Sequence, residues 1–374
     1  MESIHITDTT LRDGEQTPGV SFSDREKMII ARMLDRFGVR EIECGIPAMG
    51  PDERNVITNM VQLGLGARLI TWNRAVASDI EASIRCGIDA VAISIPVSDF
   101  HIWNKLLKSR DWVLRTMEKA VAFAKSKGTY VCAGAEDASR ADPRFLARFA
   151  EVVEACGADR LRFSDTLGQL DPFRVYEHIS ALKSRTNLPI EIHAHNDFGL
   201  ATANTLAGIH AGADFVSTTV LGLGERAGNA ALEEVAMALD RLYGVDTHLR
   251  FTFLPALCRF VSRASGRSIS PGKPVVGDKI FSHESEIHAA AVIKNPDNYE
   301  PYPPEKVGLK RRIALGKHSG RRAVSYRLRR LGIGGCHDLS ELVRKVRRFS
   351  VLAKRELSDA DLTELCETGA FLNY

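Results

Sequence analysis

The sequence lacks a long hydrophobic run, a close pair of cysteines and a strong overall charge. None of the apolar runs in its 374 residues approaches the ~20 residues of a membrane span, so we expect no membrane partner. The seven cysteines are scattered, odd in number and without Cys-x-x-Cys spacing, which is typical of reduced thiols in the cytoplasm. The first residues resemble a strand rather than a cleaved signal. We expect a cytoplasmic protein with one large domain and a smaller appendage.

The small net charge of +3 hides an uneven distribution. Between Lys306 and Arg355 the chain has 16 lysines and arginines and two acidic residues, a net of +14, so the remaining residues carry −11. Such a segment could meet nucleic acid, an anionic ligand or an acidic neighbouring subunit. No binding motif or aromatic interleaving accompanies it. We therefore expect no nucleic-acid partner and favour a solvated helix face or an intersubunit contact.

From residue 4 to about 220, short β-branched runs alternate with longer amphipathic runs, the pattern of parallel strands joined by crossover helices. Eight strands are predicted, at residues 4–8, 41–45, 68–72, 90–95, 130–135, 160–163, 190–195 and 215–220. Eight helices are predicted after them, at 24–37, 52–63, 78–86, 111–127, 143–156, 172–184, 200–211 and 230–243. Eight such units predict a TIM (β/α)₈ barrel with its active site at the C-terminal ends of the strands. A doubly wound open sheet is the alternative.

Two domains are predicted. Residues 1–245 form the catalytic barrel, and residues 246–374 form a C-terminal extension that is rich in loops with short helices. A basic helical pair closes the extension, at about 321–331 and 339–355.

Two histidines end the seventh predicted strand. Side chains alternate along a strand, so His193 and His195 point the same way and form half of a metal site. Asp13 follows the first strand, two strands away around a closed barrel, and could complete the set. Such mixed ligation accepts Mg²⁺, Mn²⁺, Fe²⁺ or Zn²⁺. Alternatively, each histidine satisfies a local hydrogen bond and Asp13 pairs with Arg12 in its turn.

Other polar residues follow the strands at the predicted barrel mouth. Arg12 would be a fixed cation where a substrate oxygen becomes negative. Glu136 is a candidate base, although a capping or salt-bridging role is open and better suits Asp137 and Arg140. Thr166 could bind a substrate carboxylate or cap the following turn.

A glycine-rich turn follows the eighth strand and leads into a helix. Gly222 and Gly224 there could form an anion site, or they could serve only a tight turn. Asn229 offers a neutral oxygen at the mouth and could be a distant or water-mediated metal ligand.

Two motifs together point to a known family. Residues 11–16 (LRDGEQ), followed by Lys27, and residues 190–203 around the sequence HAHNDFG resemble both signatures of the α-isopropylmalate synthase and homocitrate synthase family. The likeness extends to residues 222–229, 281–288 and 315–320. Within the family, residues 96–99 and 134–142 most resemble the homocitrate synthases of nitrogen fixation.

The resemblance implies an acyltransferase that condenses acetyl-CoA with 2-oxoglutarate, hydrolyses the thioester and supplies homocitrate to the nitrogenase iron-molybdenum cofactor. It implies a homodimer and a divalent ion, Mg²⁺ or Mn²⁺ first and Zn²⁺ or Fe²⁺ next. The implied metal ligands are Asp13, His193, His195 and, directly or through water, Asn229. The implied catalytic residues are Arg12, Glu136 and the partner subunit's His288, and the implied keto-acid ligands are Arg12, Gln16 and Thr166. Gly222, Gly224 and Asn229 are the residues expected at CoA or its phosphates.

The chain also departs from its relatives. Lysine-pathway homocitrate synthases hold the distal carboxylate of 2-oxoglutarate with a histidine and an arginine, where this chain has Val76 and Cys132; Arg74 is only a guess for that role. The keto acid is therefore inferred from general likeness. Glu286 replaces a usual glycine before the Ile-His pair. The sequence stops at Tyr374, so we expect no feedback-regulatory domain.

Three alternative functions stay open. The same chemistry could use 2-oxoisovalerate or pyruvate, as in 2-isopropylmalate or citramalate synthase. A lyase such as hydroxymethylglutaryl-CoA lyase would need a thiol after the glycine turn, and Cys258 is not obviously placed for it. The non-enzyme alternative is a basic scaffold or nucleic-acid-binding module that uses residues 306–355.

Overall fold

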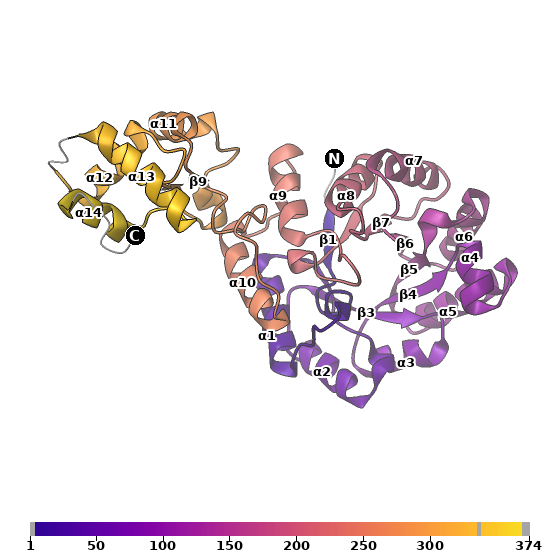
Figure 1. Cartoon of the computed structure of the whole chain (residues 1–374). Coiled ribbons are helices and arrows are strands. Elements are labelled where there is room, and N and C mark those ends of the chain that lie inside the picture. The colour runs from indigo at the N-terminus through magenta and orange to yellow at the C-terminus, as the bar shows by residue number, and fades with distance from the viewer. Residues whose placement is uncertain (1–3, 335–337, 369–374) are drawn as a thin grey trace. The chain divides into compact units, whose positions relative to one another are not determined.

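Eight parallel strands form a closed barrel surrounded by helices in the computed structural model, which describes residues 4–334 and 338–368 (Figure 1). The strands are β1 (His5–Asp8), β2 (Glu41–Glu43), β3 (Arg68–Arg74), β4 (Ala90–Pro96), β5 (Tyr130–Glu136), β6 (Arg160–Asp165), β7 (Ile190–Ala194) and β8 (Phe215–Thr218). Strand β1 pairs with both β2 and β8, which closes the sheet. The predicted (β/α)₈ barrel is confirmed, and the open sheet is excluded.

The barrel helices begin and end at local signals in the sequence. Helix α1 (Asp24–Phe37) starts with a capping box between Ser23 and Glu26 and ends at Gly38 in the left-handed conformation. The others are α2 (Pro51–Val61), α3 (Ala77–Arg85), α5 (Arg110–Ser126), α6 (Pro143–Ala155), α7 (Pro172–Lys183), α8 (Ala201–His210) and α9 (Leu232–Leu242). Each predicted barrel helix agrees with these bounds to within two residues at each end.

Several short elements lie in the connections. A compact segment formed by α4 (Asp99–His101) and the π-helical η3 (Ile102–Leu106) follows β4. The remaining short turns are η1 (Gly14–Gln16), η2 (Pro47–Met49), η4 (Ala138–Arg140), η5 (Val220–Gly222), η6 (Phe251–Phe253), η7 (Pro296–Asn298) and η8 (Pro304–Val307). The segment after β4 matters for function because it brings polar side chains to the end of β5.

The chain divides into two compact units, residues 1–269 and 270–374. The first unit extends past the predicted boundary at residue 245 because α10 (Leu254–Ser265) packs against α1. Apolar residues Leu254, Leu257, Cys258 and Val261 lie at helical spacing on its buried face.

The second unit has its own hydrophobic core and a short parallel pair, β9 (Ser282–His283) with β10 (Arg312–Ile313). Its helices are α11 (Glu286–Lys294), α12 (Arg321–Leu331), α13 (Leu339–Ala353) and α14 (Asp359–Thr368). The predicted helical pair corresponds to α12 and α13. Among the described residues, no helix is long and apolar enough to cross a membrane.

Glu286 has a structural role in this second unit. Its carboxylate accepts hydrogen bonds from the backbone N–H groups of Arg322 (3.0 Å) and Ala323 (3.5 Å), which caps the first turn of α12. A side chain at Gly320 would meet the Glu286 carboxylate, with the closest approach at 2.3 Å. Glu286 therefore joins α11 to the start of α12.

The basic segment is partly neutralised within its own unit. Arg311 pairs with Glu300 at 2.5 Å, Arg312 with Glu356 at 2.9 Å, and Arg355 with Asp361 at 2.6 Å. Arg327 contacts Asp359. These pairs reduce the net positive charge that the segment presents.

Candidate active site

Three buried side chains of types that ligate metals meet at the C-terminal end of the barrel. Asp13 follows β1, His193 lies on β7, and His195 follows it. The Nε2 atom of His193 is 3.1 Å from Asp13 Oδ2 and 3.3 Å from His195 Nε2. All three donor atoms lie within 4.8 Å of one another. The structure thus brings together the three side chains that the sequence spacing suggests.

The polar atoms of this cluster fit a divalent cation. Asp13 Oδ1 is buried and has no hydrogen-bond partner among the described residues. Protons on both Nε2 atoms of His193 and His195 would repel each other at this separation. The lone pairs of these two atoms, next to the Asp13 carboxylate, match the ligands of a shared cation. Asp13, His193 and His195 are therefore a candidate metal centre.

The protonation states also suit metal binding. Burial, assisted by His193, lowers the pKa of His195 to about 4, against the opposing effect of Asp13. Burial alone would raise the pKa of Asp13, but Arg12 and the two histidines hold it well below its usual range. A neutral imidazole and a charged carboxylate are the forms that coordinate metal.

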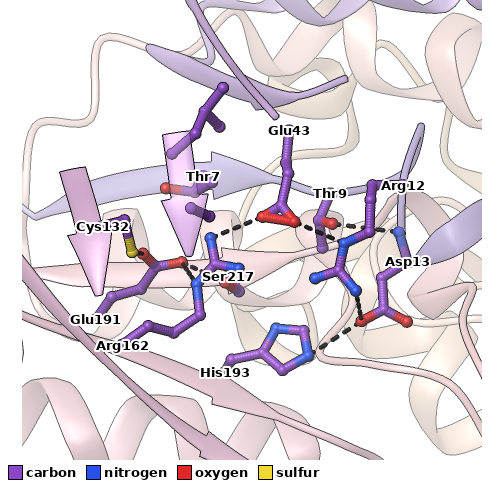
Figure 2. A network of polar contacts seen from close by, with 12 residues as sticks. Thr7, Thr9, Arg12, Asp13, Glu43, Cys132, Arg162, Glu191, His193 and Ser217 are labelled. Atoms are coloured by element: carbon purple, nitrogen blue, oxygen red, sulfur yellow. Dashed lines mark hydrogen bonds and ion pairs between the residues drawn. The ribbon is translucent and has the colours of Figure 1, made fainter. Parts of the chain in front are cut away.

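Arg12 lies beside this cluster and is held in place by two carboxylates (Figure 2). Its Nε donates to Glu43 Oε1 at 2.6 Å, and its Nη1 is 3.1 Å from Asp13 Oδ2. A guanidinium that is fixed before substrate arrives can stabilise a developing negative charge without reorganisation.

These residues line one cavity of about 180 Å³ at the barrel mouth. Gln16, Glu136 and Thr166 line the same cavity, so most of the predicted site residues share it. Thr166 Oγ1 accepts a hydrogen bond from the Asp137 N–H at 2.9 Å. The hydroxyl proton of Thr166 stays available to donate to a carboxylate.

Glu136 ends β5 and meets the segment that follows β4. Lys105 Nζ lies 2.5 Å from Glu136 Oε1, and His101 Nδ1 lies 3.3 Å from the same oxygen. The neighbouring Asp137 is buried and binds Ser98 and Arg140, as the alternative structural role anticipates. Glu136 itself faces the cavity.

The backbone N–H groups of the glycine-rich turn after β8 already donate hydrogen bonds within the protein. The N–H of Gly222 donates to Thr219 O at 3.1 Å, and the N–H of Gly224 donates to Thr17 Oγ1 at 2.7 Å. Neither amide is therefore free to bind a phosphate in this arrangement, and the predicted CoA role of these glycines finds no support in the geometry. Steric need explains them better, since a Cβ on Gly224 would lie 2.1 Å from Asn229 Nδ2.

Asn229 is buried next to the metal cluster. It forms an isolated antiparallel bridge with His195, and its Nδ2 donates to Leu223 O at 2.9 Å. Its Oδ1 is buried and has no hydrogen-bond partner among the described residues. Metal binding by Asn229 stays a prediction that this free acceptor atom supports.

His288 belongs to the second unit. It is exposed on α11, and its ring packs against Tyr299 with centroids 4.2 Å apart. Its predicted partnership with Glu136 across a dimer stays a prediction.

Comparison with known proteins assigns the family. Residues 3–261 match the HMGL-like family model, and residues 275–355 match the model described as homocitrate synthase post-HMGL domain-like. The chain belongs to the isopropylmalate and homocitrate synthase family. It is 50% identical to 2-isopropylmalate synthase 2 of Caldanaerobacter subterraneus subsp. tengcongensis, over 97% of this chain and 95% of that protein. It is 49% identical to homocitrate synthase 1 of a Nostoc species, over 98% and 97% of the two chains.

A solved structure supports the fold alone. The HMG-CoA lyase of Bacillus subtilis superposes with a TM-score of 0.65 at 20% identity, over 72% of this chain and 96% of that one. The predicted family, fold and enzyme class, an acyltransferase of the synthase type, are confirmed by these comparisons.

The sequence reasoning missed a ladder of buried ion pairs inside this synthase barrel. Glu43 joins Arg12 to Arg162, and Glu191 joins Arg162 to Arg160 (Figure 2 shows the ladder as far as Glu191). Arg160 also contacts Glu41. Charged residues at alternate positions of predicted buried strands, such as 41 and 43 or 160 and 162, were the available signal.

Proposed function

We propose that this synthase makes homocitrate from acetyl-CoA and 2-oxoglutarate. The observation that carries the proposal is the cluster of Asp13, His193 and His195 beside the fixed Arg12, in a cavity also lined by Thr166. This arrangement suits a 2-oxo acid, which offers a carboxylate and a keto oxygen on adjacent carbons. Homocitrate synthases among the full-length relatives support the choice of substrate.

Each residue has a defined task in the proposed reaction. Asp13, His193 and His195 would hold a divalent ion, with Asn229 near it. When bound, such an ion acts as a Lewis acid that polarises a carbonyl group. The hydroxyl group of Thr166 donates a hydrogen bond to the substrate 1-carboxylate.

Proton transfer and charge stabilisation complete the scheme. Glu136 removes a methyl proton from acetyl-CoA, with His288 of the partner subunit in the relay. The resulting carbon nucleophile attacks the keto carbon, and the keto oxygen becomes an alkoxide beside Arg12. Loss of one such donor costs about 3 to 4 kcal/mol of transition-state stabilisation. Water then cleaves the thioester, and CoA leaves.

Some finer features of the proposal follow the family resemblance: a homodimer, Mg²⁺ or Mn²⁺ as the ion, and homocitrate destined for the nitrogenase cofactor. Two others follow the composition: a cytoplasmic location and no nucleic-acid partner. The pairing of basic residues inside the second unit supports the exclusion of nucleic acid.

CoA release, followed with a thiol reagent, tests the proposal. Acetyl-CoA is supplied with 2-oxoglutarate, 2-oxoisovalerate or pyruvate, each with and without Mg²⁺ or Mn²⁺. We expect metal-dependent CoA release with the highest kcat/KM for 2-oxoglutarate. Release that is independent of metal in chelator-treated buffer would refute the proposed site.

One specific observation favours a second candidate. A protein at 50% identity over nearly the whole chain carries the name 2-isopropylmalate synthase 2. Preference for 2-oxoisovalerate in the same assay would assign that activity and leave the chemistry at the metal cluster intact.

A further inference from the structure

The cavity continues below the metal cluster along one row of the barrel. Ser94 on β4 pairs in register with Gly134 on β5, and Gly134 pairs with Arg162 on β6. All three residues line the cavity that holds Asp13 and the histidines. We call these three residues the distal row.

Arg162 is buried yet not fully paired. Its side chain is 4% exposed; Nε lies 2.9 Å from Glu191 Oε1, and Nη2 lies 2.7 Å from Glu43 Oε2. No hydrogen bond or ion pair joins its remaining nitrogen, Nη1, to another described residue. A buried guanidinium with a free nitrogen at a cavity wall is a donor for a planar anion.

The ladder around Arg162 carries no net charge. Arg12, Arg160 and Arg162 are matched by three glutamates, because Glu43 and Glu191 are each shared between two arginines and Arg160 also contacts Glu41. The two carboxylates at Arg162 are therefore already neutralised from their other sides. An additional carboxylate at Nη1 meets a donor whose two carboxylate partners are each shared with another arginine.

Gly134 provides the space for that carboxylate. Neighbouring strands lie about 4.8 Å apart, so the Cα atoms of Ser94 and Arg162 are separated by about 10 Å with no side chain between them. A Cβ on Gly134 would lie 3.3 Å from backbone atoms of β4 and would intrude on this gap. Ser94 on the far side also lines the cavity, and its hydroxyl can donate into the gap.

The depth of the row matches a dicarboxylic keto acid. Ser164, two positions after Arg162 on the same face of β6, pairs in register with His193. A rise of about 3.3 Å per residue places Arg162 about 6.6 Å deeper than the metal layer. Two methylene groups and a carboxylate span a distance of this order.

We propose that Arg162, with Ser94 across the gap at Gly134, binds the distal carboxylate of the keto acid and sets the preference for 2-oxoglutarate. This inference rests on the proposed function and deepens it, because it names the residues that would recognise the part of 2-oxoglutarate that distinguishes it from the other keto acids. Cys132 donates to Glu191 within the ladder, at 3.4 Å.

Paired substrates separate recognition from structure. The R162Q variant is assayed with 2-oxoglutarate and with 2-oxopentanoate, which has a methyl group in place of the distal carboxylate. We expect kcat/KM for 2-oxoglutarate to fall on the order of 100-fold, because a buried, charged hydrogen-bond donor is lost. The value for 2-oxopentanoate should fall by a clearly smaller factor, because only the disturbance of Glu43 and Arg12 affects that substrate.

The R160Q variant is the matched control. Arg160 belongs to the same strand and ladder but is not a lining residue of the cavity. The R160Q substitution should therefore change kcat/KM for both keto acids by the same factor. The S94A variant leaves the ladder intact and should lower kcat/KM for 2-oxoglutarate selectively, by about tenfold, which keeps the test decisive if R162Q fails to fold.

Substrate binding gives a readout besides turnover. Trp72 lines the cavity, so bound substrate should quench its fluorescence. Tryptophan fluorescence is followed while 2-oxoglutarate is added in the presence of Mg²⁺ and the absence of acetyl-CoA. Dissociation constants that rise in R162Q or S94A in parallel with the kinetic loss support the proposal. Equal losses for both keto acids in R162Q, with no selective loss in S94A, would overturn it. A wild-type enzyme that prefers 2-oxoisovalerate would instead refute the proposed function.

Discussion

Each residue of the candidate metal centre was predictable from its position at or after the end of a strand, whereas the ladder that supports the site was not. His193 and His195 stand on one face because side chains alternate along β7. The partners of Arg162 lie on other strands, at Glu43 and Glu191. Residue spacing reveals a shared face of one strand but not which distant charges will meet across a barrel.

Removal of one metal ligand should abolish both metal binding and turnover. In the H195A variant we expect divalent metal retained after dialysis to fall, and kcat/KM to drop by at least about 100-fold. The variant H210A is the control, because His210 is an exposed histidine on α8. Metal analysis and CoA release measure the two effects. Undiminished turnover of H195A in chelator-treated buffer would contradict the metal assignment.

Asp8 should make stability depend on pH near neutrality. Burial, with a contribution from Glu233, raises its pKa to about 7 from 3.8, although hydrogen bonds from Thr10 oppose the shift. The native state therefore holds this proton more tightly than the unfolded chain. The stabilisation is fully present below pH 3.8 and is lost as the pH rises toward 7.

The variant D8N cannot lose this proton. Relative to D8N, we expect the wild type to lose on the order of 1 kcal/mol of unfolding free energy per pH unit between about pH 4 and 7. Denaturant titrations of both proteins at several pH values measure the difference. A difference that stays constant across this range would show that Asp8 ionises normally.

Among the elements, the barrel repeats were clear from sequence, while the connections that shape the site were not. Capping residues such as Ser23 and Asp142 mark helix starts locally. The helical segment after β4 places Lys105 next to Glu136. This contact joins residues that are distant in the sequence, so no local sequence pattern predicts it. Helix α10 has the apolar spacing of a helix, but the turn residues around it place it in the predicted loop-rich extension instead of the first unit.

The turn after β8 should be intolerant of a side chain at Gly228. A Cβ there would lie 1.9 Å from Gly222 O, at a φ of +93°. We expect G228A to displace the turn that holds Asn229, to lower stability by more than about 2 kcal/mol and to reduce turnover.

The variant G244A separates steric overlap from backbone strain. Gly244 has a φ of +63°, and a Cβ there would meet nothing within 4 Å. It should cost only about 1 kcal/mol and leave turnover intact. Thermal unfolding and CoA release compare the two variants, and equal losses in both would argue against the overlap at Gly228.

On the scale of the whole molecule, the chain comprises two compact units. The boundary predicted from the sequence lies near the observed boundary but not at it. The shift in pattern after residue 244 suggested a boundary, but α10 continues the first unit to residue 269 because its apolar face packs on α1. His288 lies in the second unit and Arg12 in the first. A dimer in which each extension serves the other barrel would join these residues in one site.

Mixing two inactive variants tests that arrangement. If the partner subunit's His288 completes each site, R12A and H288A should each be inactive, and hybrid dimers should contain one intact site of two. Random exchange would then restore about a quarter of wild-type activity. No recovery, with exchange of subunits verified by mass spectrometry, would place His288 outside the partner's site.

Direct competition between keto acids tests the central claim most directly. Acetyl-CoA at limiting concentration is offered an equimolar mixture of 2-oxoglutarate, 2-oxoisovalerate and pyruvate in the presence of Mg²⁺ or Mn²⁺, and the products are separated by liquid chromatography and mass spectrometry. The product ratio reports relative kcat/KM in one vessel. A homocitrate synthase should give homocitrate as the main product; an excess of 2-isopropylmalate or citramalate would contradict the account.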